Sequence, residues 1–208
     1  MRLLLTLAVT ASLASAQVAH QHHPPTDAAE YARALSDPSR DAWQKPHEVI
    51  TALALKPTES IADIGAGPGY FARRFAHHAD TVYAVDIDEK LLKMGADGAP
   101  ANYKTILAAP DDPRLTAASV DTIFFCDVLH HISGRSAYYK KLDQALKPGG
   151  RIVIVDFYKR ELPVGPPPSM KLDRDQVIAE FKTAGFRLAK SYDFLPHQYF
   201  LVFERANP

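Results

Sequence analysis

The sequence predicts an α/β fold: a doubly wound, Rossmann-like sheet of seven strands, mostly parallel, with an antiparallel C-terminal hairpin strand. Three observations carry this prediction. Short apolar runs rich in β-branched and aromatic residues alternate with helical patterns. A glycine-rich turn follows the first run, and two strand-like runs with a tight connection close the chain. The 208 residues, 47% hydrophobic and 23% charged, have the composition of one ordinary globular domain.

Five apolar runs are continuous enough to be buried on both faces, as strands of a parallel sheet are. They are residues 60–64, 81–86, 103–108, 120–126 and 151–156. Helical patterns lie between them at 69–78, 88–95 and 134–146, with a short turn near 112–118. The last of these patterns stops at the helix-breaking Lys147-Pro148-Gly149-Gly150. Repetition of strand, helix and strand indicates crossover helices on a parallel sheet.

The remaining elements flank this core. Two helical patterns, 27–36 and 46–55, precede the first strand. A proline-rich loop follows the fifth strand and leads to a helix at about 173–184. Strand-like runs at 186–193 and 198–204 then suit an antiparallel pair at one edge of the sheet.

The first sixteen residues have the pattern of a secretory signal peptide. One arginine precedes an apolar stretch over 3–9, and small residues end at Ala16. The stretch is well short of the ~20 residues that span a bilayer. We therefore expect cleavage after Ala16, a flexible leader over 17–26 and an exported protein, periplasmic or secreted. The leader histidines lack ordered spacing, so we expect no metal site.

The charge balance bears on the class of ligand, and the cysteine content bears on disulfide bonds. Lys+Arg and Asp+Glu number 24 each, which does not favour nucleic acid or an acidic membrane surface as a partner. A small molecule is the expected ligand. Cys126 is the single cysteine, which excludes an intramolecular disulfide, and its apolar neighbours predict a buried thiol.

The stretch "ADIGAGPGYFARRF", residues 62–75, predicts a ligand site. Gly65, Gly67 and Gly69 turn the chain out of the first strand, so backbone amides face the crevice at the strand carboxyl ends. About twenty residues later, Asp86 ends the second strand, where a carboxylate can accept hydrogen bonds from two ribose hydroxyls. A nucleoside compound is therefore expected.

The glycine spacing and one carboxylate decide which nucleoside is favoured. A dinucleotide fingerprint is Gly-x-Gly-x-x-Gly, whereas here the third glycine follows after one residue. Asp63, two places before the first glycine, would repel a pyrophosphate. It suits instead a cationic ammonium, such as that of S-adenosylmethionine.

Four segments resemble motifs of the class I S-adenosylmethionine-dependent methyltransferases. They are "DIGAGPGYF", "VYAVDID", "VDTIFFCDVLHHI" and "LKPGGRIVIVDF", which occur in the family's order within residues 45–160. The likeness is nearest to the small-molecule enzymes of the ubiquinone and menaquinone biosynthesis type. It implies a single methyltransferase domain over 27–208 with an N-terminal helical cap, S-adenosylmethionine as cofactor, and methyl transfer to a small-molecule acceptor by in-line displacement.

The resemblance implies roles for individual residues around the cofactor. The loop of Gly65, Ala66, Gly67 and Gly69 would lie beneath it, and Asp63 would bind its amino group. Asp86 would hold the ribose, with Ile87 and Cys126 alongside. The family's acidic residue near adenine has no clear counterpart, because Ala109 takes its aligned place. Asp111 or Asp112 is the candidate, and a simple turn at Asp112-Pro113 is the alternative.

The segment from Asp127 to His131 corresponds to the part of the family near the transferred methyl group. His131 or His130 would act as general base and Asp127 would orient the acceptor or the cofactor. The alternative is that both histidines only pack at the strand exit. Side chains expected at the acceptor pocket are Tyr158, His197 and Tyr199, and residues 37–46 with Trp43 are expected to cap the cofactor or to form a surface linker.

Other functions stay open at this stage. An aminopropyl transferase on the same fold and a non-catalytic S-adenosylmethionine-binding protein remain alternatives, whereas the glycine spacing disfavours an NAD-dependent dehydrogenase. The absence of an Asn-Pro-Pro-Tyr or Asp-Pro-Pro-Tyr motif argues against methylation of a base amino group. Because S-adenosylmethionine is made inside cells, a cytoplasmic location is the alternative to export.

Overall fold

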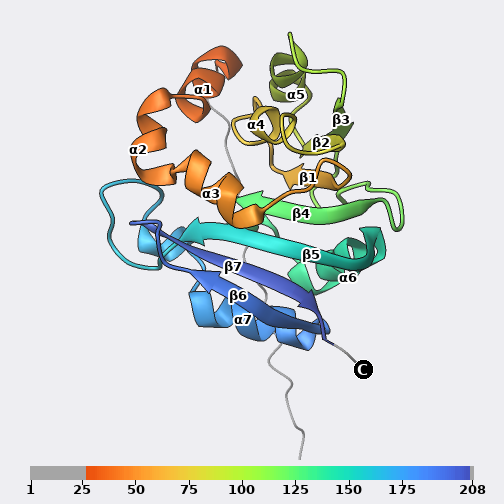
Figure 1. Ribbon diagram of the computed structural model, residues 1–208. Coiled ribbons are helices and arrows are strands. Elements are labelled where there is room, and N and C mark those ends of the chain that lie inside the picture. The colour runs from red at the N-terminus through yellow and green to blue at the C-terminus, as the bar shows by residue number, and fades with distance from the viewer. Residues whose placement is uncertain (1–26, 207–208) are drawn as a thin grey trace, which may run out of the picture.

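The computed structural model describes residues 27–206 (Figure 1). The expected signal peptide, its cleavage point and the leader lie outside the described residues. One seven-stranded sheet has the order β3-β2-β1-β4-β5-β7-β6. Its strands are β1 Ser60–Ile64, β2 Thr81–Asp86, β3 Tyr103–Leu107, β4 Val120–Cys126, β5 Leu146–Phe157, β6 Phe186–Tyr192 and β7 Gln198–Arg205.

Strand pairing confirms the predicted sheet. The pairs from β3 through β2, β1 and β4 to β5 are all parallel, whereas β7 is antiparallel to both β5 and β6. The chain builds the sheet outward from β1 in one direction and then returns to add β4 on its other side. Such a switch point opens a crevice beyond the carboxyl ends of the two strands, which are adjacent at Ile64 and Phe125.

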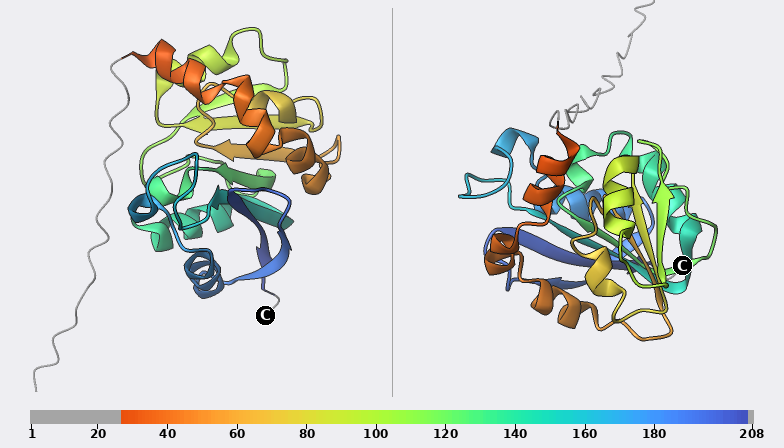
Figure 2. Two further views of the ribbon diagram at one scale, coloured as in Figure 1. Left: turned by 90° about the vertical axis from the view of Figure 1, so that its left-hand side faces the viewer. Right: turned by 90° about the horizontal axis from the view of Figure 1, so that it is seen from above.

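Helices cover both faces of the sheet (Figures 1 and 2). They are α1 Ala28–Leu35, α2 Asp41–Gln44, α3 Pro46–Leu53, α4 Ala72–Phe75, α5 Glu89–Ala96, α6 Arg135–Ala145 and α7 Arg174–Thr183. Short 3-10 turns are η1 Pro38–Arg40, η2 Leu129–His131 and η3 Pro168–Met170. The N-terminal helix α1 lies beside α5, above the carboxyl ends of the strands (Figure 2).

Alternation along the central strands divides the core into two clusters. Phe125 packs with α6 and α7 on one face, whereas its neighbour Phe124 packs with α3 and α4 on the other. The same alternation holds for Ile154 and Val155 in β5. Both faces of the sheet are therefore shielded from water, which explains why the sequences of these strands are continuous apolar runs.

Three element predictions were wrong in extent. The helix predicted over 69–78 is confined to Ala72–Phe75, because Gly69 has φ 90° and belongs to the loop. The strand predicted from 151 begins at Leu146, since the Lys147–Gly150 segment extends it past a register shift against β4. Residues 37–46, for which no helix was predicted, contain η1 and α2.

Candidate active site

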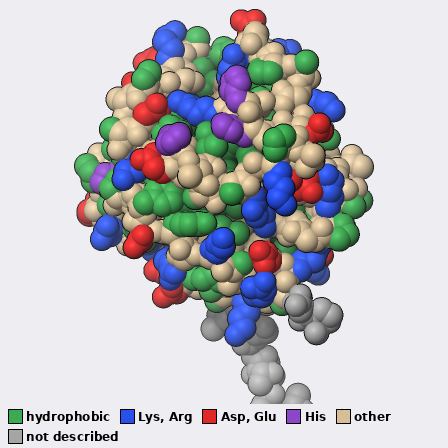
Figure 3. Space-filling view, in the orientation of Figure 1, with side chains coloured by type: hydrophobic (Ala, Val, Ile, Leu, Met, Phe, Trp, Pro, Cys, Tyr) green, Lys and Arg blue, Asp and Glu red, His purple; other side chains and the backbone are tan. Residues whose placement is uncertain are grey.

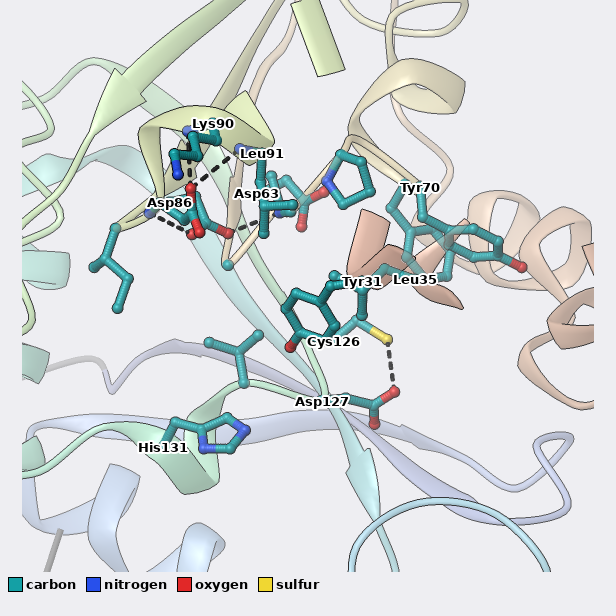
Figure 4. A pocket seen from close by; sticks show the side chains of 18 of the residues that line it. Tyr31, Leu35, Asp63, Tyr70, Asp86, Lys90, Leu91, Cys126, Asp127 and His131 are labelled. Carbon is teal, nitrogen blue, oxygen red and sulfur yellow. Dashed lines mark hydrogen bonds between the residues drawn. The ribbon is translucent and has the colours of Figure 1, made fainter. Parts of the chain in front are cut away.

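A cavity of about 600 Å³ opens at the switch point, beyond the carboxyl ends of β1, β2 and β4 (Figure 4). Small-molecule sites commonly have about 300–1,000 Å³. The loop after β1, the β2–α5 turn, the β4 exit and the N-terminal segment all contribute to its wall. The lining residues used below are Tyr31, Leu35, Arg40, Asp63, Gly65, Ala66, Gly67, Tyr70, Asp86, Ile87, Cys126, Asp127, Val128 and His131.

The glycine loop brings bare backbone to the cavity. Gly65 and Gly67 have φ of 72° and 55°, which favour glycine. A Cβ at Gly65 would lie 2.3 Å from Val128 Cγ2, and one at Gly67 would lie 3.3 Å from Leu35 Cδ1. Gly69 does not line the cavity. A Cβ at Gly69 would lie 2.8 Å from the Tyr103 hydroxyl oxygen. The third glycine therefore allows the turn of the loop but does not face the ligand site.

Asp86 is held rigidly at the end of β2. Its Oδ2 accepts a hydrogen bond from the Gly67 amide at 2.8 Å, and its Oδ1 accepts one from the Asp88 amide at 2.9 Å (Figure 4). Desolvation raises the pKa of the carboxyl group, and the two amides oppose that effect. A carboxylate has about four acceptor positions, so the Asp86 carboxylate keeps acceptor capacity for a ligand's hydroxyl groups beyond these backbone amides. Ile87 adds an exposed apolar side chain beside it.

Asp63 is a buried carboxyl group in the wall of the cavity. Its side chain accepts a hydrogen bond from the Ala72 amide, and no residue within 27–206 forms an ion pair with it. Burial, aided by the nearby Asp86 charge, raises its pKa to about 8. A cationic group placed beside Asp63 would offset this desolvation, which is the chemistry that an ammonium provides.

Asp127 follows β4 in a left-handed conformation, φ 59°, that is uncommon for a residue with a side chain. Its carboxyl group is buried, and burial together with the Asp156 charge raises its pKa to about 7. The neighbouring Cys126 thiol lies 3.6 Å from Asp127 Oδ2 and also borders the cavity (Figure 4). Burial raises the pKa of this thiol, as in a packing cysteine.

The two predicted histidines have separate environments. The ring of His131 borders the cavity (Figure 4). The ring of His130 is buried, and its Nδ1 lies 2.9 and 3.1 Å from the two oxygens of Asp156. Burial alone would lower the pKa of His130, but Asp156 raises it. The ring of His130 is therefore directed at Asp156 and is not part of the cavity wall, so the structure brings only His131 of the two predicted bases to the cavity.

The structure does not bring Asp111, the predicted adenine contact, to the cavity. An isolated bridge between Ala109 and Asp112 closes the segment into a turn. This turn leaves the Asp111 side chain 85% exposed, 3.8 Å from Lys141 on α6 and outside the cavity wall. Asp112 accepts a hydrogen bond from the Arg114 amide, so the simple-turn alternative describes this segment.

The predicted acceptor residues do not meet the cavity either. Tyr199 is fully buried beside Tyr158, with ring centroids 5.9 Å apart, and His197 packs near Trp43 at 6.5 Å. Sequence reasoning missed Tyr31 and Leu35, which reach the cavity from α1. Arg40 of η1 also lines the cavity, and it lies in the segment 37–46 that was expected to cap the cofactor. The spacing of Tyr31 and Leu35 at i and i+4 was a signal for one helix face, but it does not reveal what that face covers.

Comparisons with known proteins agree with this geometry. A family model described as a methyltransferase domain matches residues 62–154. The uncharacterized methyltransferase YdaC of Bacillus subtilis is 27% identical over 161 residues, which is 76% of this chain and 85% of that protein. The ubiquinone/menaquinone biosynthesis C-methyltransferase UbiE of Bordetella parapertussis is 28% identical over 123 residues, 56% of this chain and 48% of that protein.

Solved structures share the fold. A SAM-dependent methyltransferase from Aquifex aeolicus has a TM-score of 0.80 and 23% identity, covering 86% of this chain and 99% of its own. DhpI in complex with SAH has a TM-score of 0.62 and 18% identity, covering 86% and 95%. The chain is therefore a methyltransferase by its matched domain, and it has the fold of the S-adenosylmethionine-dependent methyltransferases. The family match and the shared fold support S-adenosylmethionine as the cofactor of this methyltransferase.

Two further features of the methyltransferase concern ions and membranes. Residues 27–206 contain no group of three His, Cys, Asp or Glu side chains arranged to hold a metal ion. In the same part of the chain, every helix is too short or too polar to cross a bilayer.

Proposed function

We propose that this methyltransferase transfers a methyl group to a small-molecule acceptor by in-line displacement. The observation that carries the proposal is the division of the cavity: Asp86 lies at one end, and Asp127 with His131 lies at the other (Figure 4). The cofactor must occupy much of the ~600 Å³, which favours a compact acceptor. UbiE, named as a C-methyltransferase of quinone biosynthesis, supports the same class of acceptor by similarity.

The described residues fit the proposed cofactor pose. Gly67 presents a backbone with no side chain to fill the cradle, Asp86 keeps open acceptor positions, and Asp63 offers a buried carboxyl group for an ammonium. Bound S-adenosylmethionine supplies a methyl group on a sulfonium. The leaving group is then a neutral thioether, which departs without help from an acid. The task of the chain is then to hold the acceptor in line and to exclude water, effects worth up to about 7–11 kcal/mol in favourable systems.

His131 and Asp127 have the chemistry to assist an acceptor that carries a proton. A neutral imidazole at His131 can accept the proton of a phenol, hydroxyl or ammonium group. Asp127 can orient that group through a hydrogen bond. Tyr70 and Val128 add apolar surface to the wall of the same cavity.

The distribution of charge supports a small acceptor over a polyanion. The molecule has 24 basic and 24 acidic residues. On the face shown in Figure 3, Lys and Arg side chains are interspersed with Asp and Glu. A basic stripe of the kind that binds nucleic acid is not formed on that face.

Cofactor binding is tested by calorimetric titration with S-adenosylhomocysteine, NAD and decarboxylated S-adenosylmethionine. We expect S-adenosylhomocysteine to bind and NAD to fail. Asp86→Ala removes a charge-assisted acceptor for two hydroxyls and should weaken binding by about 2–3 kcal/mol. Asp97→Ala, a change at an exposed carboxylate, is the matched control. Unchanged affinity in Asp86→Ala would contradict the proposed pose.

The acceptor is sought by incubating the protein with methyl-labelled cofactor and separate panels of phenols, quinols, amines and thiols. We expect labelled product in at least one small-molecule panel, with the amount reduced in Asp86→Ala. Label that enters RNA or protein while every small-molecule panel stays unlabelled would refute a small-molecule acceptor.

A further inference from the structure

Four polar side chains form a closed ring beside the cavity. Arg40 of η1 donates to Gln44 Oε1 at 3.2 Å, Gln44 Nε2 donates to Gln198 Oε1 at 2.8 Å, and Gln198 Nε2 donates to Asp127 Oδ1 at 2.6 Å. Arg40 closes the ring at 3.9 Å from Asp127 Oδ2. The ring joins the N-terminal segment, the first residue of β7 and the exit of β4.

The direction of every hydrogen bond in the ring is determined by its two ends. A guanidinium can only donate, so Gln44 must present its oxygen to Arg40 and its nitrogen to Gln198. Gln198 then presents its oxygen to Gln44 and its nitrogen to Asp127, as an ionised carboxylate requires. The two amides thus align between a cation and an anion, an arrangement in which neighbouring hydrogen bonds strengthen one another.

The two glutamine side-chain amides are buried, so each must form hydrogen bonds within the protein. Gln44 and Gln198 are both 0% exposed. A buried amide is costly unless it is hydrogen-bonded, and an apolar side chain of similar size would fill the same space without that cost. The sheet does not depend on the Gln198 side chain, because backbone pairing with Phe157 fixes the register of β7 there. The presence of glutamine at both positions is therefore best explained by the hydrogen bonds that they provide toward the Asp127 carboxylate.

The ring occupies one oxygen of Asp127 and leaves the other available. Oδ1 accepts the short bond from Gln198. Oδ2 accepts a weak hydrogen bond from the Cys126 thiol at 3.6 Å and lies 3.9 Å from Arg40, so it keeps acceptor capacity for a stronger donor. Since Asp127 borders the cavity, Oδ2 can accept an N–H or O–H group from a ligand.

We propose that Gln198 and Gln44 are positioning residues for the methyl transfer. They favour the ionised form of Asp127 and orient it, with Oδ2 presented to an acceptor that carries an N–H or O–H donor. The inference rests on the proposed function for its catalytic meaning, whereas the effect on Asp127 itself is measurable in the free protein. Arg40 connects the same ring to the cavity wall, so the N-terminal segment and the Asp127 carboxylate are fixed together.

Several other groups also act on Asp127, and the test must hold them constant. They are Arg40 from η1, His130 from η2, Asp156 from β5, Tyr199 from β7 and Cys126 from β4. Gln198 stabilises the ionised form by donating to it. Removing that donor therefore raises the pKa of Asp127, while leaving the other charged groups in place.

The experiment measures the pKa of Asp127 by carboxyl ¹³C NMR of aspartate-labelled, ligand-free protein, with Asp127→Asn assigning the resonance. We expect Gln198→Leu to raise this pKa by about one unit, the usual worth of a hydrogen bond to an ionised group. Gln44→Leu should raise it less, and the double variant should fall short of the sum, because the two residues act in series. Gln176→Leu is the matched control: that exposed glutamine donates to Glu180 at 2.9 Å, away from Asp127.

A kinetic measurement then separates this inference from the proposed function. Once an acceptor is identified, Gln198→Leu should lower kcat about 10-fold or more and shift the acid limb of the pH profile upward, with S-adenosylhomocysteine affinity nearly unchanged. Absence of cofactor binding in the unaltered protein defeats the proposed function, whatever the NMR result. If Gln198→Leu does not fold, Gln198→Met, which keeps an unbranched side chain, is measured instead. An unchanged Asp127 pKa in a folded variant, or failure of both variants to fold, overturns the positioning role.

Discussion

His130 and His131 are neighbours in the chain, with ring centroids 4.1 Å apart, yet they meet different surroundings. The Asp156 carboxylate, which engages His130, also accepts a hydrogen bond from the Phe157 amide at 2.8 Å. This anchors His130 between β5 and the exit of β4. His131 lies one residue further along η2 and borders the cavity. Of these two adjacent histidines, only His131 is therefore placed for the proposed role of general base.

Single substitutions should separate these two roles. His131→Ala should lower turnover by about 10²-fold or more, the usual worth of general-base help, with cofactor affinity nearly intact. His130→Ala leaves Asp156 buried without its partner and should mainly destabilise the fold, by about 3–5 kcal/mol. Turnover and thermal unfolding are measured for both variants. A His131→Ala variant that keeps full turnover on an ionisable acceptor would remove the histidine from the reaction.

The predicted site residues that border the cavity are those tied to a local pattern. Asp63, Gly65, Gly67 and Asp86 lie there because the strand ends and the glycine turn place them there. Asp111 lies outside the cavity wall because its direction depends on a turn that points it toward Lys141. The contacts of Gln44 and Gln198 join residues far apart in the chain, and no local pattern foretells such a pair.

Among the elements, the N-terminal segment is held mainly by tertiary contacts. The helix α2 has four residues, too few to be stable alone. Arg40 lies over the rings of Tyr70 at 4.4 Å and Trp43 at 5.6 Å, and it also donates to the Leu35 carbonyl. This dependence explains why no helix was expected there. The strands β1, β2 and β4 have the predicted bounds, because their own apolar composition marks them in the sequence, whereas β5 begins earlier than predicted.

The contacts of Trp43 provide a test of whether this segment responds to cofactor. Trp43 is the single tryptophan of the chain. The centroid of its ring lies 5.7 Å from that of Phe157, and its neighbour Arg40 borders the cavity. We expect S-adenosylhomocysteine to change its fluorescence, with a midpoint that matches the calorimetric affinity. Asp86→Ala should move that midpoint to higher concentration, and Trp43→Phe should abolish the signal. An unresponsive Trp43 at calorimetric saturation would favour the surface-linker interpretation.

For the whole molecule, the location in the cell is a separate proposal. The N-terminal pattern favours export with cleavage after Ala16, whereas the cofactor is made inside cells. N-terminal sequencing of the protein purified from its native cell fractions tests this directly. We expect a chain beginning at Gln17 outside the cytoplasm. A chain that still begins at Met1 in the cytoplasmic fraction would overturn the export proposal.

The stability of the whole molecule should depend on pH through its buried groups. The carboxyl groups of Asp63 and Asp127 have pKa values raised to about 8 and about 7, above the ordinary value of 3.8. Between about pH 4 and 8 the unfolded chain has lost these protons and the folded chain retains them, so stability falls as pH rises. The raised pKa of His130 acts in the same direction, because its contribution is lost as pH rises above its folded value.

Carboxyl groups with lowered pKa values act in a different range. Asp121 and Glu180 are stabilised in ionised form by Lys147 and Arg135, respectively. Their contribution is present above the ordinary carboxyl pKa and is lost only as pH falls below about 4, by the same linkage. The window between about pH 5 and 8.5 therefore reports mainly on the buried groups of the cavity and on His130.

Asp63→Asn should isolate the largest of these effects. Asparagine keeps an oxygen for the Ala72 amide but removes the buried charge, so we expect the ligand-free variant to unfold at least about 4 °C higher than the unaltered protein near pH 8.5, with little difference near pH 5. The same change should weaken S-adenosylmethionine binding about 10-fold or more, because the ammonium loses its carboxylate. Thermal unfolding across this pH range, with exposed Asp97→Asn as the control, measures the first effect, and calorimetry measures the second. A variant that gains stability near pH 8.5 without losing affinity would show that the buried charge at Asp63 does not serve the cofactor.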